Sequence, residues 1–347
     1  MSISDENETL TNKTEPCIPS GLIDIQALLS FVHFADSTVV ILSILSSFLQ
    51  FYVIRQAFSH IRRGNGDQCL HVFLLSMTIG DLLLTSVCYP LEYIPALWDF
   101  HLPRQINVTM HFLAWVALSG SSISLILLNL EKLLYFKYPL SYSSYVTRKR
   151  GVRITIGVWV ACFVFVSGCW FFDCFNCVED HCGTLALLPQ RTMMYIMFSI
   201  SVCITPTLTS LMVALYILKI VSSHRKKLAE EQALYSMNTT SVSHAIASRL
   251  RTFYFIFMTT VFTAATLLPY RLYQIKLISM KDSANTNEVK HCTTLLEMWT
   301  MSYLIAVNAI LNPLLTVTVL PQYRCRAVSR LFGTGTNSEH KPIATEM

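Results

Sequence analysis

The sequence predicts an all-α membrane protein, a bundle of seven membrane-spanning helices. Hydrophobic residues make up 53% of the 347 residues and charged residues only 14%, whereas a soluble protein carries about 25% charged residues. A helix needs about 20 mostly apolar residues to cross a bilayer, and seven runs of the chain reach this length. These runs are residues 29–54, 69–93, 107–134, 153–172, 193–219, 252–275 and 296–320.

Four segments divide the chain by their polarity. Residues 1–28 are polar and acidic, residues 29–320 hold the seven runs, and residues 333–347 form a polar tail. Between the bundle and the tail, residues 321–332 alternate basic and apolar side chains, which predicts a short amphipathic helix in the membrane interface. The net charge of +5 is modest, and nothing in the sequence predicts nucleic-acid binding.

Basic residues set the predicted orientation of the bundle. Most of the 26 Lys and Arg residues follow the first, third, fifth and seventh runs, and basic loops stay on the cytoplasmic side of a membrane. We therefore expect a multi-pass plasma-membrane protein with an extracellular N-terminus and a cytoplasmic C-terminus. The basic loops are also expected to attract lipid headgroups. Three glycosylation sequons lie on the predicted outer side, at Asn7, Asn12 and Asn107.

Five cysteines fall on the predicted outer side, where disulfides persist. These disulfide candidates are Cys17, Cys174, Cys177, Cys182 and Cys292. Spacing does not give their connectivity: one thiol is left unpaired or pairs with Cys169, and a bridge between Cys17 and Cys292 is one hypothesis. The spacing of the middle three with His181 also fits zinc, although an oxidising exterior favours disulfides. On the inner side, Cys325 is a candidate for palmitoylation.

A carboxylate interrupts the second run near its middle. Asp81 stands inside a long apolar stretch, and a charge near the bilayer centre costs at least about 2.5–3.5 kcal/mol. Such a residue is expected to have a partner and a function. The seventh run contains Asn308 and Asn312, which are four residues apart and therefore share one face of a helix.

Several short motifs follow one another along the runs. The seventh run contains Asn312-Pro313-Leu314-Leu315-Thr316, and the third ends in Leu130-Glu131-Lys132-Leu133, with Pro139 shortly after. Further single residues at matching places are Asp81, Pro90, Trp98, Trp159, Pro206 and Pro269. Over about residues 30 to 332 the chain therefore resembles the rhodopsin-like (class A) G-protein-coupled receptors, whose NPxxY and DRY motifs are similar to these run ends. The resemblance does not identify a subfamily.

The resemblance implies a polar centre midway through the bundle. Its members would be Asp81, Ser121, Asn308 and Asn312. The family binds a sodium ion at this place, and an allosteric sodium ion is the one cofactor or metal that the resemblance suggests. A hydrogen-bonded cluster without an ion would satisfy the same buried groups, so both interpretations stay open. Ser47 replaces the family's first-helix asparagine, which shortens the polar reach from that helix.

The resemblance also implies an activation switch. Its residues would be Glu131, Lys132, Pro206, Pro269 and Pro313. Each proline removes a backbone hydrogen bond and bends its helix. The bends either let the helices pivot and open the inner face or are static kinks shaped for packing, and both interpretations stay open. Lys132 replaces the family's arginine and lacks its planar fork of donors. It would repel Arg249, so we expect no ion pair between them, and Glu131 is expected to neutralise Lys132 or the loop arginines. Such changes predict raised basal activity or, alternatively, poor coupling to G proteins.

The ligand pocket is the last feature implied. Monoamine receptors of the family carry an aspartate where this chain has Ala114, so a monoamine ligand is not expected. Arg271 lies two residues past Pro269 at pocket depth, and a buried charge needs a partner. That partner is either an anionic ligand group or one of the acids Glu92, Asp173 and Glu297. The other candidate pocket residues are Tyr93, His111, Trp115, Tyr195, Tyr270, Gln274, Trp299 and Tyr303.

These features together predict a receptor that binds an extracellular peptide or small anionic molecule and activates a heterotrimeric G protein. The alternative is a receptor-like scaffold or modulator of the same fold with weak or no G-protein coupling. A transporter would show paired half-repeats with broken helices, and the sequence has no matching halves. No enzyme motif occurs either, so we predict no catalytic residues.

Overall fold

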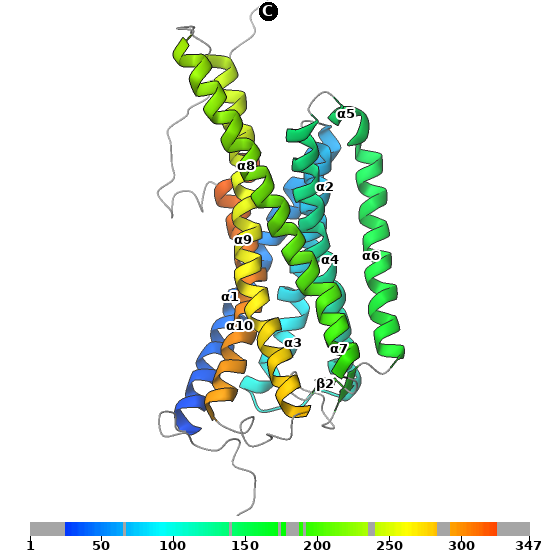
Figure 1. The fold of residues 1–347 in the computed structure, drawn as a ribbon. Helices are drawn as coiled ribbons and strands as arrows, with labels where there is room; N and C mark the ends of the chain where they lie inside the picture. The colour runs from blue at the N-terminus through cyan, green and yellow to red at the C-terminus, as the bar shows by residue number, and fades with distance from the viewer. Residues whose placement is uncertain are drawn as a thin grey trace, which may run out of the picture.

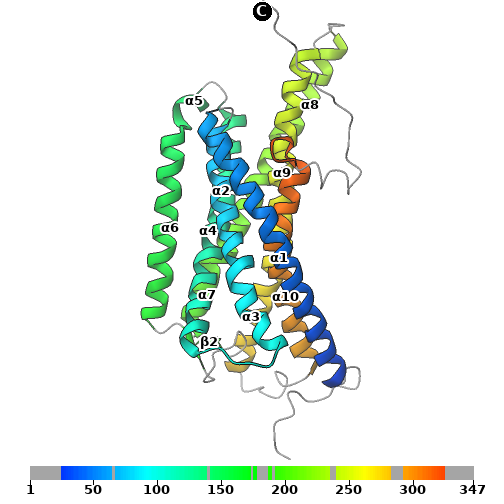
Figure 2. The ribbon, with the colours of Figure 1, turned by 180° about the vertical axis from the view of Figure 1, so that it is seen from behind.

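Seven long helices form one bundle. The structure, a computed structural model, describes residues 25–64, 67–138, 141–172, 175–177, 187–189, 192–234, 240–282 and 292–324. Within these residues seven helices are long and apolar enough to cross a membrane, which confirms the predicted fold class. Figures 1 and 2 show the helices running along one common direction, with the start of the first helix and the end of the last at opposite ends of the bundle.

The predicted runs lie on helices, except for the last residue of the runs 153–172 and 296–320, and most helices extend beyond the runs. The helices are α1 (Ile25–Arg63), α2 (Gln68–Leu83), α3 (Tyr89–Leu97), α4 (Arg104–Lys137), α6 (Arg148–Phe171), α7 (Thr192–Ser199), α8 (Thr205–Leu234), α9 (Thr240–Asp282) and α10 (Cys292–Val319). The π-helical turn η1 (Leu84–Cys88) joins α2 to α3, and η3 (Ile200–Ile204) joins α7 to α8. The second and fifth spans are therefore continuous helices that each contain one wide turn.

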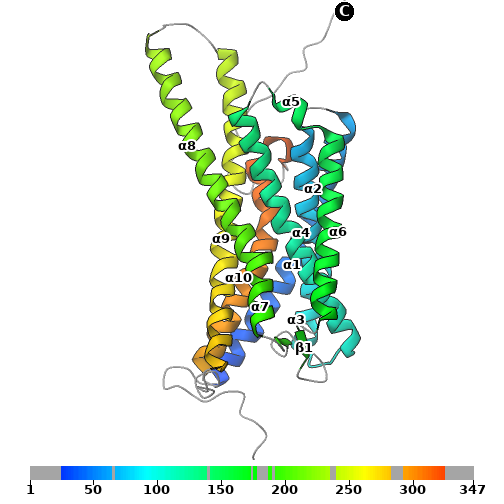
Figure 3. The same ribbon diagram turned by 45° about the vertical axis from the view of Figure 1, so that its right-hand side comes forward.

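Short elements lie at the two ends of the bundle. At one end α5 (Tyr142–Tyr145) connects α4 to α6, and at the other β1 (Phe175–Cys177) pairs antiparallel with β2 (Leu187–Pro189), as Figure 3 shows. Cys177 pairs in register with Leu187. After α10, the 3-10 turn η5 (Pro321–Tyr323) is the start of the segment predicted to be amphipathic. From residue 325 onward that segment lies outside the described residues.

The outer face of the bundle is apolar and its interior is partly polar. On α6, Ile156, Val160 and Val164 repeat at helical spacing, and each exposes more than half of its surface. Asp81 and Asn312, by contrast, are almost fully buried. Lipid chains solvate such an outer face well, whereas the buried polar groups need partners inside the protein. The distribution therefore fits a bilayer and not water.

Three prolines leave identifiable marks on the helices. Both π-helical turns end two residues before a proline, Pro90 or Pro206. Proline cannot donate the usual backbone hydrogen bond, and a π-helical turn is one way in which a helix accommodates such a defect. In α10, Pro313 leaves the carbonyl of Ala309 without its helical donor, and the amide nitrogen of Gln50 on α1 donates to that oxygen at 3.1 Å. The carbonyl that Pro313 leaves free in α10 therefore forms a hydrogen bond that holds α1 against α10.

Small residues let α2, α4 and α6 approach closely. A Cβ atom on Gly80 of α2 would lie 2.8 Å from the carbonyl oxygen of Ala117 on α4. The ring of Trp159 on α6 rests against Gly120 of α4, and its Nε1 donates to Ser76 of α2 at 2.9 Å. These contacts align the helices that carry the polar centre.

Candidate functional site

A cavity of about 120 Å³ lies between α3, α4, α9 and α10. Its lining consists of Leu84, Tyr89, Glu92, Tyr93, His111, Ala114, Trp115, Leu118, Tyr270, Arg271, Gln274, Ser302 and Ile305. Six residues predicted to bind ligand are therefore brought together here. Trp299 and Tyr303 are not part of the lining and stack on each other, with ring centroids 5.8 Å apart. The side chain of Tyr195 lies outside the described residues.

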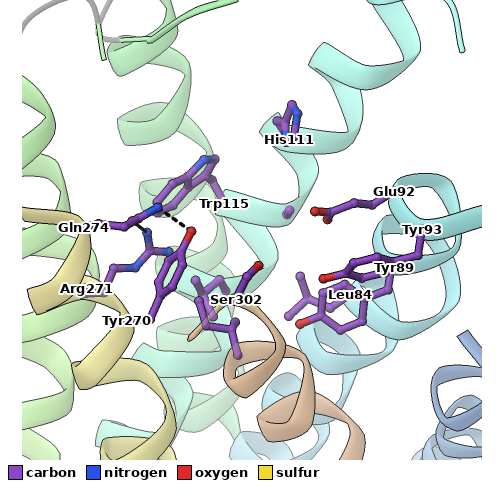
Figure 4. A pocket seen from close by; sticks show the side chains of 13 residues that line it. Leu84, Tyr89, Glu92, Tyr93, His111, Trp115, Tyr270, Arg271, Gln274 and Ser302 are labelled. Atoms are coloured by element: carbon purple, nitrogen blue, oxygen red, sulfur yellow. Dashed lines mark hydrogen bonds between the residues drawn. The ribbon is translucent and has the colours of Figure 1, made fainter. Parts of the chain in front are cut away.

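Trp115, Tyr270 and Gln274 are among the neighbours that hold Arg271 in place on one wall of the cavity. Its guanidinium carbon lies 4.4 Å from the ring centre of Trp115 and 4.9 Å from that of Tyr270. One of its terminal nitrogens donates to the side-chain oxygen of Gln274 at 2.8 Å, and Gln274 in turn donates to the hydroxyl of Tyr270. Only 4% of Arg271 is exposed. Figure 4 shows this group facing the space between the helices.

The structure places two of the three acids proposed as internal partners of Arg271. Glu297 accepts a hydrogen bond from Tyr273 at 2.6 Å. Glu92 is on α3 across the cavity, where Figure 4 shows its carboxylate pointing toward the space. Asp173 is outside the described residues. The cavity therefore has a cationic wall on α9 and an anionic wall on α3.

Two tyrosines stand beside Glu92. Tyr93 forms a side-chain hydrogen bond with Ser302 of α10. The hydroxyl of Tyr89 is buried and has no hydrogen-bond partner among the described residues. Sequence reasoning missed Tyr89 and Ser302 as lining residues. One signal for Tyr89 was available, because it lies three residues before Glu92 and so on the same helix face.

The predicted polar centre forms around Asp81. Ser121 donates to one oxygen of its carboxylate at 2.8 Å and Asn312 to the other at 2.7 Å. Asn308 instead accepts a hydrogen bond from Thr263 of α9 at 3.1 Å. The side-chain oxygen of Asn312 is buried without a hydrogen-bond partner in the described part of the chain. A carboxylate beside an amide oxygen that accepts no hydrogen bond is a donor set that suits a hard cation such as sodium.

Gln50 extends this centre to α1, and sequence reasoning missed it. Its side-chain oxygen accepts from Thr85 at 2.8 Å, and Ser47 donates to the same Thr85 hydroxyl at 3.1 Å. Ser47 bonds to Thr85 and to its own helix, whereas Gln50 reaches α10 through the carbonyl of Ala309 and Ser46 through that of Ile310. The signal was present, because an amide inside an apolar run needs partners.

A second buried carboxylate was also missed. Asp36 on α1 is 2% exposed and accepts a hydrogen bond from the hydroxyl of Tyr303 at 2.7 Å. The ring of Tyr303 lies 6.0 Å from that of Tyr93, which lines the cavity. An acid within the first run was a sufficient signal for a buried pair.

Four side chains form a cluster at the opposite end of α4. The ammonium group of Lys132 lies 2.5 Å from Asp67 and 2.9 Å from Glu131. The hydroxyl of Tyr142 on α5, which has one hydrogen to donate, lies 2.5 Å from an oxygen of Asp67 and also contacts an oxygen of Glu131. Glu131 therefore neutralises Lys132, one of the two predicted options. Sequence reasoning missed Asp67 and Tyr142. The side chain of Arg249 lies outside the described residues.

The titration of this cluster follows from its charges. Burial alone would raise the pKa of Asp67, but the positive charge of Lys132 and the hydrogen bonds from Lys132 and Tyr142 outweigh it and hold that pKa below the usual 3.8. Burial, followed by the charges of Glu131 and Asp67, raises the pKa of Tyr142 far above its usual value. Asp67 is therefore ionised and Tyr142 is a neutral donor at physiological pH.

The predicted modification sites lie mostly outside the described residues. These sites are Asn7, Asn12, Cys17, Cys174, Cys182 and Cys325. Asn107 is in the first turn of α4, Cys177 is in β1, and Cys292 is the first residue of α10. Glycosylation, the disulfides and palmitoylation therefore stay predictions. Within the described part of the chain, no group of three or more His, Cys, Asp or Glu side chains is placed to hold a metal ion.

Comparison with known proteins gives independent evidence on the family of this chain. Residues 60–315, well over half of the chain, match the family described as 7 transmembrane receptor (rhodopsin family). The chain is 25% identical to the G-protein coupled receptor aex-2 of Caenorhabditis elegans over 268 residues, which cover 77% of this chain and 74% of that protein.

Two further relatives match over shorter stretches. The chain is 26% identical over 132 residues to the cholecystokinin receptor type A of Oryctolagus cuniculus, which is 38% of this chain and 30% of that receptor. It is 27% identical over 103 residues to the alpha-1A adrenergic receptor of Rattus norvegicus, which is 28% of this chain and 21% of that receptor. The matches thus span less than a third of either receptor.

Proposed function

Because the chain belongs to the rhodopsin family of seven-transmembrane receptors, we propose that it binds an extracellular ligand with an anionic group and activates a heterotrimeric G protein. Seven apolar helices make it a multi-pass membrane protein. We propose the plasma membrane as its location, with the N-terminus outside and the C-terminus in the cytoplasm. The excess of basic residues after the odd-numbered spans supports this orientation.

The observation that carries the ligand proposal is the setting of Arg271. It is a buried guanidinium that lines a cavity, and two aromatic rings and one amide fix its orientation. Arginine presents donors in a planar fork that matches a carboxylate or phosphate. Because the fork is already oriented, an anionic ligand would order little of the protein on binding, which favours affinity.

The proposed inner partner is a G protein, and two features favour it. α8 and α9 extend well beyond the other helices at the end that carries α5, as Figure 1 shows. The basic residues that follow the third and fifth spans lie on that same side in the predicted orientation. The long helices and the basic composition of these segments together favour docking of a cytoplasmic protein at this end.

A G-protein dissociation assay in cells tests this proposal. The cells would express the full chain and receive small carboxylates and peptides with a free C-terminus, each beside its amidated counterpart. We expect at least one free acid to activate and its amide to be much weaker. Replacing Arg271 with Gln should reduce potency about 10- to 100-fold, because hydrogen bonds to charged groups are worth about 1.5–3 kcal/mol.

The matched control replaces Lys276 with Gln, which removes a cation from α9 outside the cavity lining. This variant should respond like the unaltered chain. Equal loss in both variants would contradict a role for Arg271 in ligand binding. Ligand binding without any G-protein dissociation would favour the scaffold or modulator alternative.

A further inference from the structure

We propose that the cavity takes a small zwitterion, with an anionic group at Arg271 and an amine at Glu92. This inference rests on the proposed receptor function only in treating the cavity as the ligand site. The two charges come from different helices, Arg271 from α9 and Glu92 from α3, and both line the same space. In Figure 4 the two side chains approach that space from opposite sides.

The anionic end of the ligand meets an oriented donor. Trp115 and Tyr270 lie 4.4 Å and 4.9 Å from the guanidinium carbon, and the Gln274 oxygen accepts from one of its nitrogens at 2.8 Å. These contacts come from α4 and α9, so they position the charge relative to both helices. A carboxylate fits the remaining face of such a fork better than a single hydroxyl does.

The amine end of the ligand meets acceptors. Glu92 is half-buried and directs its carboxylate toward the space. The hydroxyl of Tyr89 lies on the same wall, is buried, and has no hydrogen-bond partner among the described residues. A buried hydroxyl without a partner is unfavourable, and an ammonium N–H donor would satisfy its oxygen. The ring centres of Tyr89 and Tyr93 are 6.2 Å apart, and aromatic rings near a cation add attraction.

The volume of the cavity decides between a small molecule and a peptide end. It measures about 120 Å³, whereas pockets for drug-sized ligands measure about 300–1,000 Å³. A peptide terminus brings only one of the two charges into so small a space, a carboxylate or an amine. A molecule of amino-acid size carries both charges on one short framework, so it matches both walls at once.

Thermal stability of the purified full chain tests this proposal without any G protein. The probes are the proteinogenic L-amino acids, each with its N-acetyl and its C-amide derivative. We expect at least one amino acid to raise the unfolding temperature, and both of its capped derivatives to bind about 10-fold more weakly or worse, as the loss of a charge-assisted hydrogen bond implies. No stabilisation by any amino acid would overturn the proposal, and so would equal stabilisation by the capped forms.

Two variants assign the ends of the ligand. Glu92→Gln should remove the preference for the free amine over the N-acetyl form, and Arg271→Gln the preference for the free acid over the amide. Their controls are Glu297→Gln and Lys276→Gln, which lie on the same half of the bundle outside the cavity lining. Controls that lose the preferences equally would overturn the assignment. Binding without G-protein activation would leave this inference standing and contradict only the proposed signalling.

A second and independent observation concerns the inner half of α9. We infer that Asn129 is a latch that holds α9 against α4 in this state. Asn129 on α4 is fully buried, and its amide nitrogen donates to Thr260 of α9 at 2.9 Å and to Ser210 of α8 at 2.6 Å. It also lies 3.0 Å from the carbonyl oxygen of Leu125 in its own helix. One amide group therefore ties three helices together.

Thr260 fixes the direction of its own hydrogen bond with Asn129. Its hydroxyl hydrogen goes to the carbonyl of Ile256 at 2.8 Å, so its oxygen is left to accept from Asn129. Lys132, one turn further along α4, is paired with Asp67 and Glu131. Opening of the inner face by movement of α9 would break the bond from Asn129 to Thr260.

The latch is tested by the distance between α4 and α9 in the purified chain, measured with spin labels on the two helices. Asn129→Ala and Thr260→Val should each raise the population with α9 moved outward about 2- to 10-fold, as the loss of one neutral hydrogen bond implies. The double variant should match Asn129→Ala alone, because that change already removes the bond to Thr260 together with the bond to Ser210.

Thr259→Val is the matched control, because the neighbouring hydroxyl of Thr259 is buried without a hydrogen-bond partner among the described residues. It should leave the distance distribution unchanged. Unchanged distances in the Asn129 and Thr260 variants would overturn the latch, and so would an equal effect of the control. The readout needs neither ligand nor G protein, so it stays separate from the proposed signalling.

Discussion

The ammonium group of Lys132 lies 2.5 Å from the carboxylate of Asp67, which directly precedes α2. Lys132 belongs to α4, and Tyr142 of α5 donates to the same carboxylate. A charge that the sequence aligns with an activation switch is therefore bound to α2 and α5 in this state. Any movement that frees Lys132 has to break these contacts first.

Replacing Asp67 with Asn should destabilise the protein. The change removes a charge-assisted acceptor for Lys132 and Tyr142, and leaves Lys132 paired with Glu131. Hydrogen bonds to charged groups are worth about 1.5–3 kcal/mol, so we expect a loss of that order in the free energy of unfolding. Thermal unfolding of the two purified proteins at neutral pH measures it. An unchanged unfolding temperature would contradict a stabilising role for the pair.

The difference in stability between the unaltered protein and the Asp67→Asn variant should depend on pH, because the pKa of Asp67 is lowered. Because the folded pKa lies below the usual 3.8, the unfolded chain takes up a proton first as pH falls. The stabilisation is complete above that usual value and is lost as pH falls through the lower, folded pKa. The difference between Asp67 and its Asn variant should therefore stay constant from about pH 8 to about pH 5 and shrink below about pH 4. A difference that shrinks between pH 7 and pH 5 would contradict this assignment.

Sodium should stabilise the unaltered protein through Asp81. We expect sodium chloride to raise the unfolding temperature above that in choline chloride of equal ionic strength. At ten times its dissociation constant an ion contributes about 1.4 kcal/mol. Asp81→Asn should abolish the difference, whereas Asp36→Asn, which changes a buried acid far from this centre in the sequence, should keep it. Equal stability of the unaltered protein in both salts would mean that the cluster holds no ion.

The pair formed by Asp36 and Tyr303 should behave as a unit. Tyr303→Phe removes the hydroxyl that donates to the buried carboxylate, and an unsatisfied buried group costs about 1–3 kcal/mol. Replacing Asp36 with Leu in that variant should restore most of the loss, because neither partner is then left alone. Unfolding temperatures of the single and double variants give the coupling. Additive losses would show that the two side chains act separately.

Gly80 should tolerate no larger side chain. A Cβ atom there would lie 2.8 Å from a backbone oxygen of α4, so Gly80→Ala has to push α2 and α4 apart, at a cost of about 1–3 kcal/mol. Gly157 on α6 has nothing within 4 Å of the equivalent position. Gly157→Ala should therefore leave the unfolding temperature unchanged or raise it slightly. Similar losses in both variants would contradict the close-packing account.

The polar centre around Asp81 shows which contacts can be predicted from the sequence and which cannot. A carboxylate in an apolar run requires partners, and Asn312 is indeed one of them. Asn308 shares its helix face, yet it bonds to Thr263 on α9. One face of a helix borders two neighbouring helices, so periodicity places a residue on a face without selecting the neighbour it contacts. That choice depends on helix packing, which the pattern of one chain does not encode locally.

The cluster of Lys132, Glu131, Asp67 and Tyr142 shows which contacts the sequence does not predict. Glu131 follows from its place beside Lys132, but Asp67 and Tyr142 lie in and near connecting segments. Their approach to Lys132 depends on how the loops close over the bundle. Gln50 and Asp36 are different cases, because both are polar residues inside an apolar run and could have been selected by the same argument that selected Asp81.

Because α9 is long, a change of the bend at Pro269 would displace the far end of the helix strongly. At a rise of 1.5 Å per residue, the part of α9 that precedes Pro269 is about 44 Å long. A tilt of about 10° at the proline would carry its far tip about 8 Å sideways, most of the width of a helix. Arg271 lies on the shorter part of α9, two residues after Pro269. A tilt at Pro269 would therefore displace the far end of α9 much more than it displaces Arg271.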